Sequence, residues 1–206
     1  MEGGRAQARF GHTAVRASEG QLLVFGGAIE STDQSFVTTN DTFLLDCATL
    51  TWERLRNEGA VPCQRAAHAM VCVDEWEAML FGGALVGGYI TKEQLYHVRA
   101  ERGAALWSEV RTGAERPRAR YGHSLVFAKP LLVLFGGSTG SETLNDVWLL
   151  NVGQREFAWE RLEVAGAAPS PRVYHHAELC GFGGATGMVI VYGGRDAENR
   201  VLEEVW

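Results

Sequence analysis

Four histidines recur in register along the chain, and their spacing is the feature that could do chemistry. His12, His68, His123 and His175 lie about 55 residues apart, a period typical of repeat proteins. Imidazole is a common metal ligand, so histidines that begin equivalent strands could converge on one ion. However, a catalytic metal site normally combines three or four ligands of mixed type at one place. We therefore interpret these histidines as parts of the scaffold, and we predict no metal ligand among them.

Other catalytic signatures are absent from the sequence. Gly136-Gly137-Ser138-Thr139-Gly140 has the spacing of a Gly-x-Ser-x-Gly motif, but no helical pattern follows it, so it lacks the strand-turn-helix elbow of a hydrolytic serine. No Walker-type phosphate loop occurs. The four cysteines show no paired spacing that would indicate a zinc site or a disulfide framework. We predict that the chain is not an enzyme and that it contains no catalytic, cofactor-binding or metal-binding residue.

Each of these histidines belongs to a longer repeated pattern. An Arg-x-x-His sequence is followed by a Gly-Gly pair, an aromatic residue and, in three copies, a tryptophan. The four copies begin Arg9-Phe10-Gly11-His12, Arg65-Ala66-Ala67-His68, Arg120-Tyr121-Gly122-His123 and Arg172-Val173-Tyr174-His175. Their Gly-Gly pairs are Gly26-Gly27, Gly82-Gly83, Gly136-Gly137 and Gly193-Gly194. Such a repeat indicates a propeller or a solenoid rather than a domain with a single core.

Four short segments in each repeat have the composition of β-strands, and we name them A to D in chain order. In the first repeat they are residues 12–16, 22–25, 42–46 and 52–55, which are rich in Val, Leu, Phe and Trp. No stretch carries apolar residues at helical spacing over three turns. A four-stranded sheet cannot bury both faces alone, so we predict sheets stacked as propeller blades. The Gly-Gly pair ends strand B, where positive φ and close backbone approach favour glycine.

This pattern resembles the kelch family of β-propellers over nearly the whole chain. WD40 propellers have shorter repeats and a terminal Trp-Asp pair, which is absent here. The resemblance implies an all-β propeller fragment over residues 1–206, with three complete four-stranded antiparallel blades and part of a fourth. We place the blades at approximately 9–56, 65–111, 120–163 and 172–206. Kelch propellers usually close with about six or seven blades. We therefore expect a fragment of a larger protein, whose open flanks could self-associate.

Residues 118–206 show a more particular resemblance. Asn145-Asp146-Val147-Trp148, Pro169-Ser170-Pro171-Arg172 and the run that ends in Gly193-Gly194 are similar to the kelch half of the kelch-domain Ser/Thr protein phosphatases. Those proteins occur in plants, where they act in brassinosteroid signalling, and in apicomplexans. The resemblance implies a module that positions substrates or regulates a phosphatase domain. That domain, with its two metal ions, would lie outside this sequence, because its Gly-Asp-x-His-Gly motif is absent here.

Two alternative functions remain open within the kelch resemblance. One is an adaptor unrelated to a phosphatase, such as a receptor that brings substrates to a ubiquitin ligase. The other is a kelch enzyme with its own metal. A copper site of the galactose-oxidase type would need Tyr, Cys and two His ligands at one place, and the spacing supports no such set.

The overall charge and the absence of targeting signals limit the partners further. The formal net charge of -6 argues against general binding to nucleic acid or membrane surfaces. The first residues of this sequence do not resemble a secretory signal, and no apolar run is long enough to span a bilayer. We expect a protein of the cytoplasm, with the nucleus as the alternative.

The loops that differ between repeats are the candidates for partner binding. Because strand direction alternates, the D–A and B–C loops emerge at the same end of each blade. Exposed aromatic residues and arginines on such loops are favoured contact residues at protein interfaces. The candidates are Phe36, Tyr89, Arg116, Arg118 and Arg195. We predict that they bind a protein partner, an acidic or phosphorylated peptide, or a phosphatase domain of the same chain.

Overall fold

The computed structural model describes residues 5–181 and 183–206, and in this part of the chain the regular structure is β-sheet with one short 3-10 turn. Contacts divide the chain into two compact units, Met1–Val110 and Arg111–Trp206. Each unit is described by itself. No helix among the described residues is long and apolar enough to cross a membrane.

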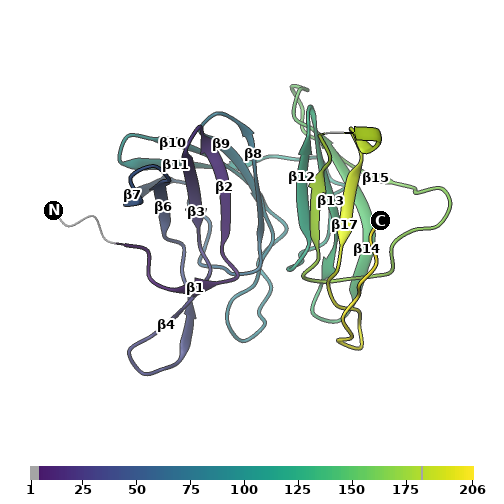
Figure 1. Ribbon diagram of the computed structural model, residues 1–206, viewed down its shortest axis with the longest axis horizontal. Helices are drawn as coiled ribbons and strands as arrows, with labels where there is room; N and C mark the ends of the chain where they lie inside the picture. The colour runs from purple at the N-terminus through teal and green to yellow at the C-terminus, as the bar shows by residue number, and fades with distance from the viewer. Residues whose placement is uncertain (1–4, 182) are drawn as a thin grey trace. The chain divides into compact units, whose positions relative to one another are not determined.

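Unit 1 contains two four-stranded blades, in which each strand pairs antiparallel with the next along the chain. The strands run in the order A to D within each blade, and tight turns join A to B and C to D (Figure 1). In the first blade they are β2 (Thr13–Ser18), β3 (Gln21–Phe25), β6 (Thr42–Asp46) and β7 (Thr51–Gly59), and in the second β8 (Ala69–Asp74), β9 (Glu77–Phe81), β10 (Leu95–Glu101) and β11 (Ala104–Val110).

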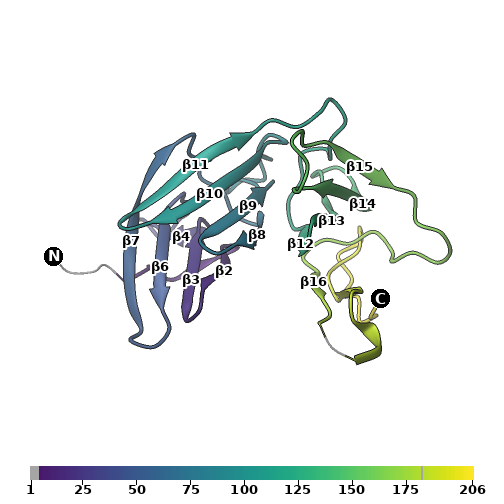
Figure 2. The same ribbon diagram turned by 90° about the horizontal axis from the view of Figure 1, so that it is seen from above.

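The two D strands of unit 1 join its blades into one sheet. The end of β7 pairs parallel with β11, from Arg56 opposite Ala104 to Gly59 opposite Trp107. The result is a continuous eight-stranded sheet, and Figure 2 shows the two strands side by side. This pairing covers one edge of each blade, so those backbone groups are not exposed as a free sheet edge.

Unit 2 repeats the same plan. Its complete blade has β12 (Ser124–Ala128), β13 (Leu131–Ser138), β14 (Thr143–Asn151) and β15 (Trp159–Leu162) in antiparallel order. The next repeat contributes the antiparallel pair β16 (His176–Leu179) and β17 (Val189–Tyr192), with the 3-10 turn η1 (Gly183–Ala185) between them. A bridge between Tyr192 and Val205 begins the third strand of that repeat.

A small antiparallel arrangement links the D–A and B–C loops in every repeat. In the first repeat it is a three-stranded sheet of β1 (Arg9–Phe10), β4 (Ala28–Glu30) and β5 (Phe36–Thr38). Bridges link Ala66 with Ala84 in the second repeat, Tyr121 with Ser138 in the third, and Val173 with Arg195 in the fourth. The two loop types therefore lie beside each other at one end of the strands, as the alternation of strand direction predicts.

The core strands are buried at consecutive positions, such as 23–25 in β3 and 78–81 in β9, because both faces of these strands are covered. In unit 1 a cluster that includes Phe25, Leu80, Val98 and Trp107 packs between the blades. The eight glycines of the Gly-Gly pairs all have positive φ, as expected from the sequence. The fold predicted from the sequence, four-stranded antiparallel blades of a propeller, is confirmed.

Candidate protein-interaction surface

The register arginines hold the loops in place from inside the blades. The side chains of Arg65, Arg120 and Arg172 are almost completely buried. In each of the four repeats the arginine Nη1 donates to the carbonyl of the first glycine of its Gly-Gly pair, at 2.9 to 3.0 Å. Its Nε donates to the carbonyl two residues earlier, at 3.0 to 3.1 Å. These arginines therefore tie the D–A loop to the end of strand B.

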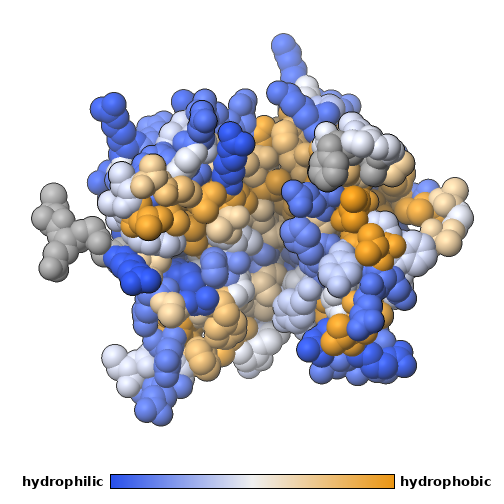
Figure 3. All heavy atoms as spheres, viewed as in Figure 1, coloured by the Kyte–Doolittle hydropathy of each residue, from blue (hydrophilic) through white to orange (hydrophobic). Residues whose placement is uncertain are grey.

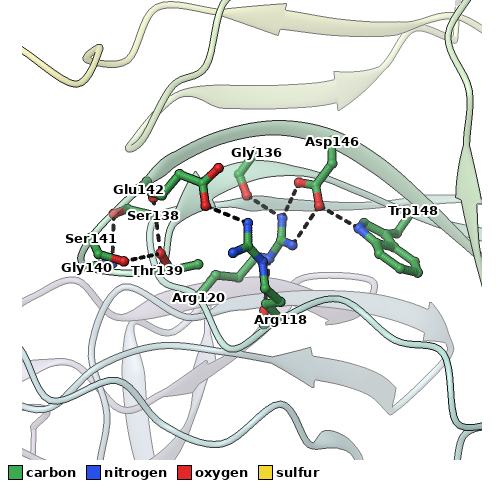
Figure 4. A network of polar contacts seen from close by, with 10 residues as sticks. All are labelled: Arg118, Arg120, Gly136, Ser138, Thr139, Gly140, Ser141, Glu142, Asp146 and Trp148. Carbon is green, nitrogen blue, oxygen red and sulfur yellow. Dashed lines mark hydrogen bonds and ion pairs between the residues drawn. The ribbon is translucent and has the colours of Figure 1, made fainter.

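Arg120 also has a carboxylate partner. Its Nη1 lies 2.6 Å from Asp146 Oδ1 and its Nη2 lies 2.9 Å from Asp146 Oδ2, while Trp148 Nε1 donates to the same carboxylate at 2.7 Å (Figure 4). Burial alone would raise the pKa of Asp146. The hydrogen bonds and charge of Arg120 outweigh burial and leave this pKa below its usual value.

Two of the register histidines tie neighbouring blades together. His68 Nε2 lies 2.8 Å from Thr13 Oγ1 in unit 1, and His175 Nε2 lies 2.9 Å from Ser124 Oγ in unit 2. Burial, reinforced by the nearby Arg65, lowers the pKa of His68 to about 3. Burial likewise lowers the pKa of His175 to about 4, with a smaller contribution from Arg172. Both rings are neutral near pH 7 and act as scaffold contacts between blades.

Backbone hydrogen bonds repeat at the same two blade contacts. Gly27 N–H donates to the Arg65 carbonyl and Gly137 N–H donates to the Arg172 carbonyl, each at 2.8 Å. The described residues contain no group of three or more His, Cys, Asp and Glu side chains that could hold a metal ion. The repeated arginines, and the histidines of the second and fourth repeats, thus make contacts within the fold.

The two aromatic candidates of unit 1 are exposed on its B–C loops. Phe36 is 49% exposed and packs edge-on against Phe10, with ring centroids 5.2 Å apart. Tyr89 is 76% exposed, and its carbonyl accepts a hydrogen bond from Leu85 N–H that closes the loop. Both residues present apolar area on loops that backbone pairing holds in place. Sequence reasoning missed Phe10, which supports Phe36 from the D–A loop.

The arginine candidates of unit 2 are exposed but have different surroundings. Arg118 Nη2 lies 2.8 Å from Glu142 Oε2 in a surface ion pair between the D–A and B–C loops (Figure 4). Arg116 lies two residues earlier and is exposed. Arg195 is exposed and donates to the Asn199 carbonyl at 2.9 Å. The structure thus places all three on the predicted loops, with Arg118 already paired.

Tyr174 is a further exposed aromatic residue that sequence reasoning did not single out. It is 60% exposed, and its ring centroid lies 5.9 Å from that of Tyr121. Its φ is 59°, in the left-handed region where the first and third repeats have Gly11 and Gly122. A tyrosine in the place of a glycine could have been noticed by aligning the repeats. Tyr174 joins Arg195 among the candidate contact residues of unit 2.

Antiparallel blades of four strands, repeated and tied together by recurring arginine and histidine contacts, define a β-propeller architecture. A solved structure titled "Structure of YjhT" matches this fold with a TM-score of 0.65 and 13% identity, over 96% of this chain and 80% of that one. Residues 11–206 match the family described as the KLHDC2/KLHL20/DRC7 Kelch-repeats domain. The chain belongs to the kelch-repeat family.

Several named relatives share this domain and are much longer than the chain. An F-box/kelch-repeat protein of Arabidopsis thaliana is 29% identical over 100% of this chain and 44% of its own length. The serine/threonine-protein phosphatase BSL2 of the same plant is 30% identical over 82% of this chain and 16% of its own length. Human Host cell factor 1 is 29% identical over 82% and 9%. The chain therefore spans less than half the length of these relatives.

Proposed function

We propose that this kelch domain is a protein-interaction module and that its D–A and B–C loops form the contact surface. The observation that carries this proposal is the contrast between repeated and unique residues. The repeated arginine and histidine side chains of the second, third and fourth repeats are buried in the fold, while Phe36, Tyr89 and Tyr174 are exposed on loops held by backbone pairing. Large aromatic side chains on rigid loops are typical anchors of protein interfaces.

The loop arginines give this surface a chemical preference. Arg116 and Arg118 are exposed on one D–A loop, and guanidinium groups pair with carboxylate or phosphate. The ion pair of Arg118 with Glu142 is exposed on both sides, so its contribution to stability is only ~0–1 kcal/mol and a partner's acid could replace it. The proposed ligand of unit 2 is an acidic or phosphorylated peptide segment of a partner protein.

A display library of acidic and phosphorylated peptides, selected on the purified chain, tests this proposal. Charge reversal in Arg116→Glu/Arg118→Glu should weaken binding of the selected peptides by about tenfold or more. The melting temperature should hardly change, because both side chains are exposed. Arg16→Glu/Arg155→Glu makes the same change in net charge away from these loops and should leave binding within about twofold. Equal losses in both double variants, or no selected peptides, would contradict the proposal.

For the whole protein we propose a Ser/Thr phosphatase whose catalytic domain this module regulates or supplies with substrate. The similarity to BSL2 supports this reading. The second candidate is a substrate receptor of a ubiquitin ligase. The F-box relative supports this candidate, because its match covers all of this chain. The complete coding sequence on both sides of these 206 residues decides between them. A Gly-Asp-x-His-Gly motif in that sequence would support the phosphatase proposal. An F-box there would contradict the phosphatase proposal and support the substrate receptor.

A further inference from the structure

A hollow of about 460 Å³ lies at the other end of unit 1, away from the loops proposed to bind a partner. It is formed by the A–B turn of the second blade, the C–D turn of the same blade, and strands of the first blade. Leu44, Trp76 and Ala100 form its apolar wall, and Glu53, Glu101 and Arg102 its charged rim. A volume of this size is within the range of small-ligand sites, at roughly 300–1,000 Å³.

Trp76 has an unusual backbone conformation for a residue of its size. Its φ is 65°, and the equivalent turn of the first blade has Gly20 with φ 73°. Left-handed conformations are unfavourable for bulky L-residues. The conformation is held by two hydrogen bonds of 2.8 Å, from Trp76 N–H to the Ala17 carbonyl and from Ala100 N–H to the Trp76 carbonyl. The turn thus places an indole where a glycine would satisfy the backbone.

The indole is only partly buried. It packs against the core cluster of unit 1 beside Leu44, and it also lines the hollow. Core packing alone does not explain this tryptophan, because its side chain is not fully buried. Strained backbone conformations cluster at ligand sites and other functional sites. The exposed part of the indole therefore provides an apolar and aromatic surface for a ligand.

The surroundings of Trp76 are acidic. Glu53 and Glu101 are exposed at the rim, and of these only Glu101 is in an ion pair within the described residues, with Arg99 at 3.5 Å. A neighbouring hollow between the A–B turns is lined by Glu19, Asp74 and Glu75 together with Arg16. The two hollows together carry five carboxylates and two guanidinium groups. Figure 3 shows hydrophilic residues crowding this upper end of unit 1.

We propose that the Trp76 hollow binds a lysine or arginine side chain from a basic segment of a partner protein. The aliphatic part of such a side chain would lie along Leu44, Ala100 and the indole. Its cation would interact with the indole face and with the carboxylates of Glu53 and Glu101. This surface is separate from the D–A and B–C loops, so the proposal stands independently of the proposed function.

Fluorescence anisotropy with a labelled Gly/Ser peptide that carries several lysines tests the inference. Saturable binding with a dissociation constant below about 1 mM is expected. The same peptide with glutamate in place of lysine should not bind. Glu53→Gln/Glu101→Gln should weaken binding about five- to tenfold, and Trp76→Gly, which suits the turn but removes the indole, should do the same. Arg102→Gln should leave binding unchanged or tighten it.

A matched control separates the hollow from the general negative charge of the chain. Glu30→Gln/Glu163→Gln removes two exposed carboxylates elsewhere and should change binding by less than about twofold. Equal weakening in the control and in Glu53→Gln/Glu101→Gln would overturn the proposal in favour of nonspecific attraction. It would also be overturned by preference for the glutamate peptide, by unchanged binding in Trp76→Gly, or by no saturable binding in the stated range.

Discussion

Arg120 and Asp146 form a buried ion pair in which both guanidinium Nη atoms reach the carboxylate, at 2.6 and 2.9 Å. The arginine side chain is inaccessible to solvent, and that of Asp146 is 12% exposed. A charge in such a place depends on its partner, because a buried ion left alone is strongly unfavourable. A more exposed version of this pair occurs in the fourth repeat, where the buried Arg172 Nη2 lies 2.7 Å from Glu204, whose side chain is 53% exposed.

Removal of Asp146 should therefore be costly. We expect Asp146→Ala to lower the free energy of unfolding by about 3 kcal/mol, because the guanidinium of Arg120 and the indole N–H of Trp148 both lose their acceptor. The exposed pair offers the control: Glu142→Ala breaks the ion pair with Arg118 and should cost at most about 1 kcal/mol. Urea unfolding of both variants measures the difference. Equal losses would show that burial does not determine how much an ion pair contributes to the free energy of unfolding.

The second repeat has lost this carboxylate together with a second charge. Gln94 stands where the other repeats have Asp41, Asp146 and Glu204, and Tyr96 lies beneath the guanidinium of Arg65. On the neighbouring strand Glu109 pairs with Tyr96 in register, where the first and third repeats have Arg54 and Arg161. Gln94 donates to Glu109 at 2.9 Å, so the two changes compensate each other.

A double-mutant cycle should reveal this compensation. Gln94→Asp alone should give little or no stabilisation, because the new carboxylate meets Glu109. Gln94→Asp/Glu109→Arg should stabilise the protein by about 1 kcal/mol relative to the sum of the single changes. The new carboxylate would then lie between two guanidinium groups, as Asp41 lies between Arg9 and Arg54 in the first repeat. Chemical denaturation of the four proteins measures the coupling, and additive effects would refute it.

A glycine of a Gly-Gly pair can be compared with an exposed glycine of similar φ, which separates the effect of crowding from that of backbone strain. Gly137 has φ 91° and Gly166 has φ 87°. A Cβ on Gly137 would come within 2.7 Å of His123 Cβ, whereas one on Gly166 would meet nothing within 4 Å. We expect Gly166→Ala to cost about 1–2 kcal/mol from backbone strain alone and Gly137→Ala to cost about 3 kcal/mol or more. Thermal unfolding compares them, and similar losses would mean that the contact relaxes.

Stability should fall when the pH is lowered below neutrality. Because the pKa of His68 is about 3 in the folded protein and about 6.5 when unfolded, the unfolded state takes up the proton first. The stabilisation is complete above about pH 6.5 and is lost toward pH 3, by up to about 1.4 kcal/mol per pH unit. His68→Gln, which keeps a side chain able to reach Thr13, should show a shallower decline in urea unfolding between about pH 7 and pH 5. An unchanged slope would argue against burial of a neutral ring.

Strand positions could be predicted because short segments rich in Val, Leu, Phe and Trp recur in every repeat together with the Gly-Gly pairs. The sequence did not reveal how far β7 extends, because Arg56, Asn57 and Glu58 are polar and give no strand signal. Asn57 is held by the fold: its Oδ1 accepts hydrogen bonds from Thr42 at 2.6 Å and from Trp107 Nε1 at 3.0 Å. Contacts of this kind bring together residues far apart in the chain, so no local pattern predicts them.

The candidate surface was predictable in a similar, partial way. Loop residues that break the repeat, such as Phe36, Tyr89 and Arg116, can be found by comparing the four copies. The pairing of Arg118 with Glu142 depends on how two loops are folded toward each other, and the spacing of the residues does not encode it. The sequence shows a tryptophan at position 76, but its positive φ and the hollow beside it are visible only in the structure.

The parallel pairing of β7 with β11 has a consequence for how unit 1 opens. In repeat arrays each module contacts only its neighbours, and stability is approximately a sum of module and interface contributions. Here shared main-chain hydrogen bonds make the first two modules a single cooperative element, so the amides of both strands should exchange with deuterium at matching rates. A substitution that destabilises one of these two blades should then lower the stability of the other as well.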